Sequence, residues 1–405
     1  MNNKNLNFKN YIQAQNLKSN FTLSIAKKFD KIFFDIKDDI KNTTKTLNIL
    51  DKKFKFNFNF KDLIKFKNFK TIAIIGMGGS ILGAEAIYNF LENKINKKIY
   101  FFDDLNDENI IKFKKKNKTS KVLFIIISKS GNTIETLSNT FFLNILKKNK
   151  KNILIISERK NNLLFSLSKK LNLFYIEHKT SIGGRYSVLS EVGIIPAFLM
   201  GININKFRSK ILECIKVKNK NFLKDSTVKL AKIIHAKKFN NLIFINYEPC
   251  LEKFLFWCQQ LIGESLGKKN KGFLPVVSNS PKDHHSLLQL YLDGPKDKLF
   301  YIFSFDKKSK NLVNLNKNLQ INNFLNKKKL STIKNAQKKA LIKCFLKKDI
   351  PFREFKIRSF DEEALGELFS YFIVETVFIG KLLNINPFDQ PAVEQVKLYT
   401  KQILS

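Results

Sequence analysis

The stretch VLFIII at residues 122–127, followed by SKSGNTIET at residues 128–136, decides the fold of this chain. Six apolar and largely β-branched residues in a row are typical of a strand buried inside a parallel sheet. The strand ends at hydroxyls, a lysine and a glycine, and a helical pattern then begins. Such turns bind phosphate, because the N–H groups of a helix N-terminus lie beside hydroxyl donors and a cation. A capped βα turn is the alternative, but the polar residues exceed what a cap needs. We therefore predict a phosphate site at Ser128, Lys129, Ser130 and Thr133.

The bulk properties of the chain fit a globular protein with two domains. Its 405 residues are enough for two full cores, and no stretch approaches the ~20 uninterrupted apolar residues of a membrane span. The opening MNNKN lacks the apolar core of a signal peptide. The four cysteines show neither a CxxC spacing nor histidines at metal-ligand spacing, so we expect a reducing cytoplasm without structural zinc or disulfides. They are Cys214, Cys250, Cys258 and Cys344.

The formal charge of +39 raises the hypothesis of a nucleic-acid partner. The excess lysines are spread over almost every segment, together with abundant Asn, Ile and Phe. These residue types share AT-rich codons, so a compositional bias explains the charge without a polyanion. The segment KFKFNFNF at residues 53–60 could stack bases, but its alternation equally fits a half-buried strand or a loop. We expect no specific nucleic acid and no membrane, and leave weak RNA or membrane-surface association open.

From Thr71 onward, strand and helix patterns alternate, which is typical of doubly wound α/β sheets. The first series of predicted strands covers Thr71–Ile75, Ile99–Phe102, Val122–Ile127, Ile153–Ile156 and Leu173–Ile176. The second series covers Leu242–Asn246, Phe273–Val277, Leu299–Ser304 and a strand near Phe355–Phe360. Helices are expected at residues 249–266, 284–292, 328–348, 361–383 and 391–404.

The predicted fold class is α/β, with two doubly wound parallel sheets in three-layer αβα domains and helical extensions at both ends. The boundaries are an N-terminal helical extension at 1–50, a first domain at 51–205, a second at 206–365 and a C-terminal arm at 366–405. The lysine-rich stretch 203–229 is expected to contain the junction. An irregular apolar face predicts the N-terminal helix, and it consists of Phe21, Leu23, Ile25, Phe29, Ile32, Phe33 and Ile36.

The turn after the first strand reads GMGGSILG at residues 76–83. It resembles a dinucleotide-binding fingerprint only in part, because Ile81 occupies the place of the third glycine. Asp103 and Asp104 after the second strand could imitate the ribose-binding acid. Glycines that let backbone approach a ligand, with Ser80 at the helix start, fit a sugar or a phosphate better than NAD.

Four further stretches carry residue types that are used in catalysis. Arg185 lies in GGRYSVLS (183–190), and Glu264 lies near a helix end in QLIGESLGK (260–268). DHHSLLQ (283–289) holds two of the four histidines, and NPFDQPAVEQVK (386–397) ends in a lysine. Taken singly, each has a structural explanation: a surface ion pair, a solvated glutamate, a core histidine, or one of many lysines.

Together, in this order, the motifs resemble the glucose-6-phosphate isomerase (phosphoglucose isomerase) family. The likeness runs from Thr71 to the C-terminus, and it implies two sugar-isomerase (SIS) domains. It further implies reversible isomerisation of glucose 6-phosphate and fructose 6-phosphate in glycolysis and gluconeogenesis, through a cis-enediol and without metal or organic cofactor. A homodimer is also implied, in which the ring-opening histidine reaches the neighbouring subunit's site. The matching stretches are 76–83, 128–136, 183–190, 264–268, 285–289 and 386–397.

The resemblance also implies a role for each site residue. Glu264 matches the base that moves a proton between C2 and C1, a task that suits a carboxylate. Arg185 matches the cation that stabilises the enediolate. His285, helped by Lys397, would open the sugar ring, and Glu135 would orient His285. The residues matched to substrate binding are Gly79, Ser80, Ser128, Lys129, Ser130, Thr133, Gln260 and Gln390.

Some positions depart from the family pattern. Ala392 replaces a usual glycine, and His284 precedes the candidate acid, although the register to Ser286 and Gln289 selects His285. The phosphate loop reads SKSGNT at residues 128–133, where larger members have bulkier, threonine-rich loops. It is also similar to SIS domains in general, including isomerases that accept mannose 6-phosphate. The alternatives are therefore a dual or amino-sugar-phosphate isomerase, a sugar-phosphate sensor without turnover, and a nucleic-acid binder. The complete set of acid, base and cations argues against a sensor.

Overall fold

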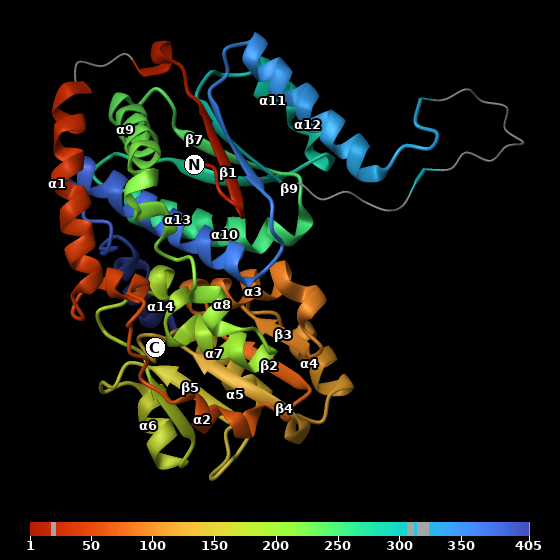
Figure 1. Cartoon of the computed structure of the whole chain (residues 1–405). Coiled ribbons are helices and arrows are strands. Elements are labelled where there is room, and N and C mark those ends of the chain that lie inside the picture. The colour runs from red at the N-terminus through yellow and green to blue at the C-terminus, as the bar shows by residue number, and fades with distance from the viewer. Residues whose placement is uncertain (18–21, 306–311, 314–323, 405) are drawn as a thin grey trace, which may run out of the picture.

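The computed structural model describes residues 1–17, 22–305, 312–313 and 324–404. Two lobes lie one above the other, and each is built on a five-stranded sheet (Figure 1). The first sheet has the strand order β3-β2-β4-β5-β6 and is parallel throughout. Its strands are β2 (Thr71–Ile75), β3 (Lys98–Phe102), β4 (Val122–Ile127), β5 (Ile153–Ser157) and β6 (Phe174–Glu177).

The second sheet has the order β1-β10-β9-β7-β8, and its four later strands run parallel. These strands are β7 (Asn241–Asn246), β8 (Leu274–Asn279), β9 (Lys298–Phe305) and β10 (Phe352–Ile357). The prediction of two doubly wound α/β sheets is thus confirmed. The last strand begins three residues before the predicted Phe355, because Phe352 and Phe355 both point into the core.

The fifth strand of the second sheet corrects the prediction for the N-terminus. Residues expected to be helical form β1 (Leu6–Tyr11), which pairs antiparallel with β10. Leu6 and Phe8 are buried while Lys9 is exposed, so the strand follows the two-residue period of a half-buried edge. The predicted helix is confined to α1 (Thr22–Lys41). Its predicted apolar face is buried from Ile25 to Ile36, whereas Phe21 and the side chain of Leu23 lie outside the described residues.

Helices cover the sheets and fill the space between the lobes. Residues 53–60, where a strand or a loop was open, contain no strand, and their phenylalanines pack on one another. The domain boundaries stay a prediction. The other α-helices are α2 (Phe60–Leu63), α3 (Leu82–Leu91), α4 (Asp107–Lys116), α5 (Ile134–Leu143), α6 (Leu163–Lys170), α7 (Glu191–Met200), α8 (Ile204–Arg208), α9 (Lys220–Ala236), α10 (Glu252–Leu266), α11 (Leu288–Asp293), α12 (Leu330–Lys347), α13 (Glu362–Leu382) and α14 (Val393–Leu404).

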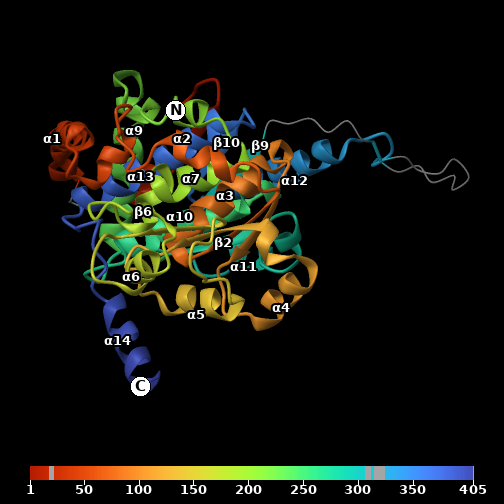
Figure 2. The same cartoon turned by 90° about the horizontal axis from the view of Figure 1, so that it is seen from below.

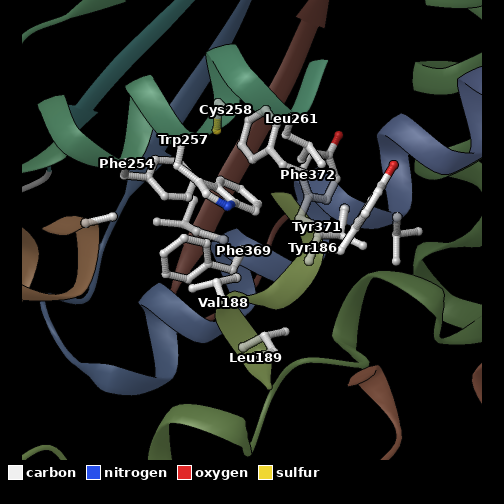
Figure 3. Close-up of a cluster of buried hydrophobic side chains, with 14 of the residues drawn as sticks. Tyr186, Val188, Leu189, Phe254, Trp257, Cys258, Leu261, Phe369, Tyr371 and Phe372 are labelled. Atoms are coloured by element: carbon white, nitrogen blue, oxygen red, sulfur yellow. The ribbon is translucent and has the colours of Figure 1, made fainter. Parts of the chain in front are cut away.

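The two lobes share a core in which α10 packs against both α3 and α13. Figure 3 shows aromatic side chains of α10 and α13 gathered with residues of the 3-10 helix Gly184–Leu189. The rings of Trp257 and Phe369 meet edge to face with centroids 4.7 Å apart. Edge-to-face pairs of this kind add about 0.5–1.5 kcal/mol to the burial energy. This shared core fixes the segment around Arg185 against the end of α10, where the candidate site lies.

Candidate active site

A polar cavity of about 290 Å³ lies at the carboxyl ends of β2 and β4. In open α/β sheets ligands bind at this place, where the strand order reverses direction. The cavity brings together ten of the thirteen residues that the sequence nominated. Its lining consists of Met77, Gly79, Ser80, Lys129, Ser130, Thr133, Glu158, Gly184, Arg185, Gln260, Glu264, Gln390, Glu394 and Lys397.

The loop after β4 is held in shape by its own hydroxyl groups. Ser128 Oγ lies 2.8 Å from Thr133 Oγ1 and accepts the N–H of Gly131 at 3.1 Å. Gly131 has φ +67°, and a Cβ there would come within 1.8 Å of Asn162 Oδ1, so the turn requires glycine. Ser128 is buried beneath the cavity, whereas Ser130 is exposed. The N–H groups of the first turn of α5 have no partner within the helix, so this loop suits an anion.

Lys129 supplies the positive charge of this loop. Its Nζ donates to the carbonyl oxygen of Thr180 at 3.0 Å and lies 3.6 Å from Glu158 Oε1. Burial lowers the pKa of the Lys129 amine, and the Glu158 carboxylate acts against that effect.

The turn after β2 packs against the segment that carries Arg185. A Cβ on Gly79 would lie 2.2 Å from the carbonyl carbon of Gly184, so only glycine permits this approach. Ser80 follows at the end of the short 3-10 helix Gly78–Ser80 and lines the cavity. The close contact connects the two stretches of the first lobe that face α10.

Arg185 is the most constrained side chain of the site, with 2% of its surface exposed. Its Nη1 donates to Glu264 Oε2 at 3.1 Å and to Gln390 Oε1 at 3.0 Å. Nε donates to Ser265 Oγ at 2.8 Å, and Nη2 donates to the carbonyl oxygen of Pro387 at 2.6 Å. These hydrogen bonds fix the planar, charged guanidinium group of Arg185 between α10 and the C-terminal segment.

Glu264 presents a carboxylate to the cavity near the end of α10. Its side chain is 30% exposed, and it accepts from Arg185 at one oxygen and from Gln260 Nε2, at 2.9 Å, at the other. Gln260 Oε1 is buried and has no hydrogen-bond partner among the described residues. A second cavity of about 590 Å³ and a third of about 920 Å³ also reach Glu264. The carboxylate is therefore approachable from several sides.

The segment after α13 is tied to α10 by Lys268. Its Nζ donates to the carbonyl oxygen of Asn386 and to Asp389 Oδ1, both at 2.6 Å. The hydrogen bond from Lys268 lowers the pKa of the Asp389 carboxyl. The anchored segment brings Gln390 to Arg185 and starts α14 at the mouth of the cavity. Figure 2 shows α14 extending away from the body of the protein.

Lys397 lies on α14 and lines the cavity, and its Nζ is 2.7 Å from Glu394 Oε1. Its side chain is 56% exposed, and no residue of α14 is buried. His285 is not in the cavity lining: it ends the 3-10 helix Lys282–His285 and is exposed. Glu135, in the first turn of α5, also lies outside the lining.

The two neighbouring histidines differ in their surroundings. His284 Nε2 lies 2.8 Å from the hydroxyl oxygen of Tyr247, and burial lowers the pKa of the His284 imidazole. His284 thus packs on its own lobe while His285 faces solvent. Of the two, His285 is the one available to another molecule.

Sequence reasoning did not nominate Glu158 or the scaffold beneath Arg185. Glu158 directly follows β5, and its position at a carboxyl strand end is the signal that could have found it. Trp257 Nε1 donates to the carbonyl oxygen of Arg185 at 3.1 Å, and the Tyr186 hydroxyl donates to that of Pro387 at 2.8 Å. Such buried partners cannot be recognised before the fold is known.

The described residues show neither a metal cluster nor a membrane-spanning helix. Within the described ranges, no group of three or more His, Cys, Asp or Glu side chains is arranged to hold a metal ion. Among the helices that the structure describes, none is long and apolar enough to cross a membrane.

Comparisons with known proteins agree on one family. The family model described as phosphoglucose isomerase matches residues 31–405. The glucose-6-phosphate isomerase of Methanocaldococcus jannaschii is 33% identical over 371 residues, which are 86% of this chain and 90% of that protein. That of Campylobacter jejuni is 30% identical over 378 residues, with 89% and 90% covered.

Solved structures share the fold at lower identity. A hypothetical protein from Thermus thermophilus superimposes with a TM-score of 0.79 at 22% identity, covering 98% of this chain and 100% of that one. A glucose-6-phosphate isomerase from Chlamydia trachomatis gives a TM-score of 0.70 at 18% identity, with 91% and 74% covered.

Proposed function

Because the chain belongs to the phosphoglucose isomerase family, we propose that it interconverts glucose 6-phosphate and fructose 6-phosphate through a cis-enediol. One observation carries the proposal: a single cavity is lined by a loop of hydroxyls with a lysine, by a buried guanidinium and by a carboxylate. An anchored phosphate positions the sugar chain, and positioning supplies a large part of the rate enhancement in such reactions.

The chemistry follows from where the charges lie. Glu264 takes the C2 proton of the open-chain aldose, and the electron pair moves toward O1 to give an enediolate. Arg185, held rigid by its five acceptors, stabilises that developing charge. The hydroxyl proton of O2 passes to O1, Glu264 returns its proton to C1, and the electron pair left on O2 forms the C2 carbonyl of the ketose. Gln260 and Gln390 hold sugar hydroxyls, and Gly79 and Ser80 complete the phosphate end of the site.

A coupled assay tests the proposal directly. Purified protein is given fructose 6-phosphate, and glucose 6-phosphate is detected with an excess of its dehydrogenase. We expect turnover that exhaustive dialysis against EDTA leaves unchanged, because the described residues contain no cluster with metal-ligand geometry. No glucose 6-phosphate, or activity that returns only with added zinc or manganese, would contradict the proposal.

We further propose a homodimer in which His285 of one subunit opens the ring in its partner's site, assisted by Lys397. Two observations support it: His285 is exposed and outside its own cavity, and α14 buries no side chain. A helix with this many exposed apolar residues is typical of an association surface. They are Val393, Val396, Leu398, Tyr399, Ile403 and Leu404.

Mixing two inactive variants tests the shared site. In a heterodimer of His285→Ala and Glu264→Gln, one of the two sites has both wild-type groups. Random re-association of equal amounts should restore about a quarter of wild-type activity, measured after co-refolding, while each variant alone stays inactive. A fully active monomer by light scattering at assay concentration would refute the dimer. A cytoplasmic location is part of the same proposal, and four cysteines outside any disulfide support it.

A further inference from the structure

We propose that Glu158 is a positioning residue for Lys129, and that it keeps the phosphate loop charged at alkaline pH. The inference rests on the proposed function in taking a sugar phosphate as the ligand. Glu158 follows β5 directly, and 6% of its surface is exposed. It lines the same cavity as Lys129 and Ser130 but has no place in the proposed proton transfers.

Glu158 contacts the phosphate loop through both its main chain and its side chain. Its N–H donates to the carbonyl oxygen of Lys129 at 3.0 Å. Its Oε1 lies 3.6 Å from Lys129 Nζ, and its Oε2 lies 2.7 Å from Lys160 Nζ. The Lys160 side chain is 63% exposed. One carboxylate therefore joins a lysine inside the cavity to a lysine at the surface, and the outer lysine offsets the charge that would repel a phosphate.

The loop that carries Glu158 supports the phosphate loop along its length. Leu164 N–H donates to the carbonyl oxygen of Gly131 at 3.2 Å, and Leu163 N–H donates to Asn132 Oδ1 at 2.9 Å. Asn162 Nδ2 donates to the carbonyl oxygen of Glu158 at 2.8 Å. The turn of the β5–α6 connection is thus fixed against the turn that would bind phosphate, and Glu158 is the acidic residue of that connection.

Among the charged groups that act on Lys129, Glu158 is the negative one. Burial lowers the pKa of Lys129, and the positive charges of Lys160 and Arg185 lower it further, while Glu158 raises it. His178 contributes no charge near neutral pH, because burial lowers the pKa of its imidazole to about 4. The same cavity is lined by Glu264, Glu394 and Lys397. Removing the Glu158 charge should therefore let Lys129 lose its proton at a lower pH.

The test is the pH profile of substrate affinity in Glu158→Gln. The amide keeps the shape of the side chain and removes its charge. KM for fructose 6-phosphate should rise at alkaline pH, where Lys129 loses its proton. In Glu158→Gln we expect kcat to stay near the wild-type value, and this alkaline rise of KM to begin about 1 pH unit lower. The same shift should appear in the Kd of 6-phosphogluconate measured by calorimetry, which needs no turnover. A chain without isomerase activity would then contradict the proposed function while still testing Glu158.

Two variants complete the experiment. Lys160→Gln, which removes the exposed partner, should not move the alkaline rise to lower pH. In Lys129→Arg/Glu158→Gln, the guanidinium stays protonated, so the alkaline rise should disappear. An unshifted profile in Glu158→Gln, or a KM raised equally at every pH, would overturn the proposal. An alkaline rise that persists in the double variant, or no binding of 6-phosphogluconate at any pH, would overturn it as well.

Discussion

The two sheets place four parallel strands in the same order but differ at the point where a ligand would bind. In each, the first parallel strand has its successor on one side and the third strand on the other: β3-β2-β4 and β8-β7-β9. In the first lobe, glycines at 76–79 and hydroxyls at 128–133 meet there and leave a cavity. In the second lobe, Glu248 Oε1 accepts the N–H of Phe305 at 3.2 Å, and its Oε2 accepts from Lys334 Nζ at 2.8 Å.

In the second lobe, the Glu248 carboxylate thus accepts hydrogen bonds from the kind of donors that would bind an anion. The cavity beside it, of about 370 Å³, is also rich in lysine. Topology therefore provides two equivalent places, and their side chains differ, because the donors of the second place already serve the Glu248 carboxylate. The lysines that line the cavity of the second lobe are Lys329, Lys334, Lys338 and Lys356.

The largest effect should come from neutralising Glu264 at the first lobe's cavity, and the matched control neutralises Glu248 at the equivalent place in the second sheet. Glu264→Gln keeps the shape and the contact with Arg185 but removes the base, so kcat should fall by ~10²–10⁴ while sugar phosphate still binds. The matched change Glu248→Gln weakens the ion pair with Lys334 at the place in the second sheet where the strand order reverses. It should leave kcat near the wild-type value. Both variants are compared with the wild type by their turnover and by the exchange of the C2 proton with deuterated solvent. Wild-type exchange in Glu264→Gln would make Glu135 or Glu394 the next candidate base.

The strands of the sheets were predictable where their burial is continuous. Val122–Ile127 and Thr71–Ile75 appear with the predicted bounds, because a strand covered on both faces requires an uninterrupted apolar run. β1 was missed, since its short alternation of Leu6 and Phe8 acquires meaning only beside β10, about 350 positions later in the chain. The information for that strand is non-local.

The site was predictable where a residue follows a strand or belongs to an ordered motif. Lys129 and Arg185 could be nominated in this way, and both line the cavity. Glu158 was not nominated, because its position after a strand is a weaker signal than an ordered motif and also fits a solvated turn residue. The position of His285 outside the cavity also depends on tertiary structure, and so does the burial of Arg185.

A smaller effect, on affinity, would sharpen the comparison at the phosphate loop. Ser130→Asp places a carboxylate beside the hydroxyls of Ser128 and Thr133, where the phosphate dianion is proposed to bind. Repulsion between like charges a few ångströms apart should raise KM for fructose 6-phosphate at least ~10-fold, and kcat should change much less. Thr332→Asp is the matched variant: this residue lies in the first turn of α12 and lines the cavity of the second lobe. Its KM should equal that of wild type.

Inhibition by 6-phosphogluconate separates the possible outcomes for the two lobes. If the loop after β4 binds the phosphate, the inhibition constant rises with KM in Ser130→Asp and stays constant in Thr332→Asp. Unchanged inhibition in Ser130→Asp would mean that Ser128, Ser130 and Thr133 only cap α5. Equal losses of affinity in both variants would mean that the strand ends of the second sheet also contribute to anion binding, although the Glu248 carboxylate accepts the donors there. Circular dichroism of both variants provides the control for folding: we expect native spectra, because Thr332 lies in the first turn of α12 and Ser130 in the loop before α5, where a negative charge is compatible with the helix dipole.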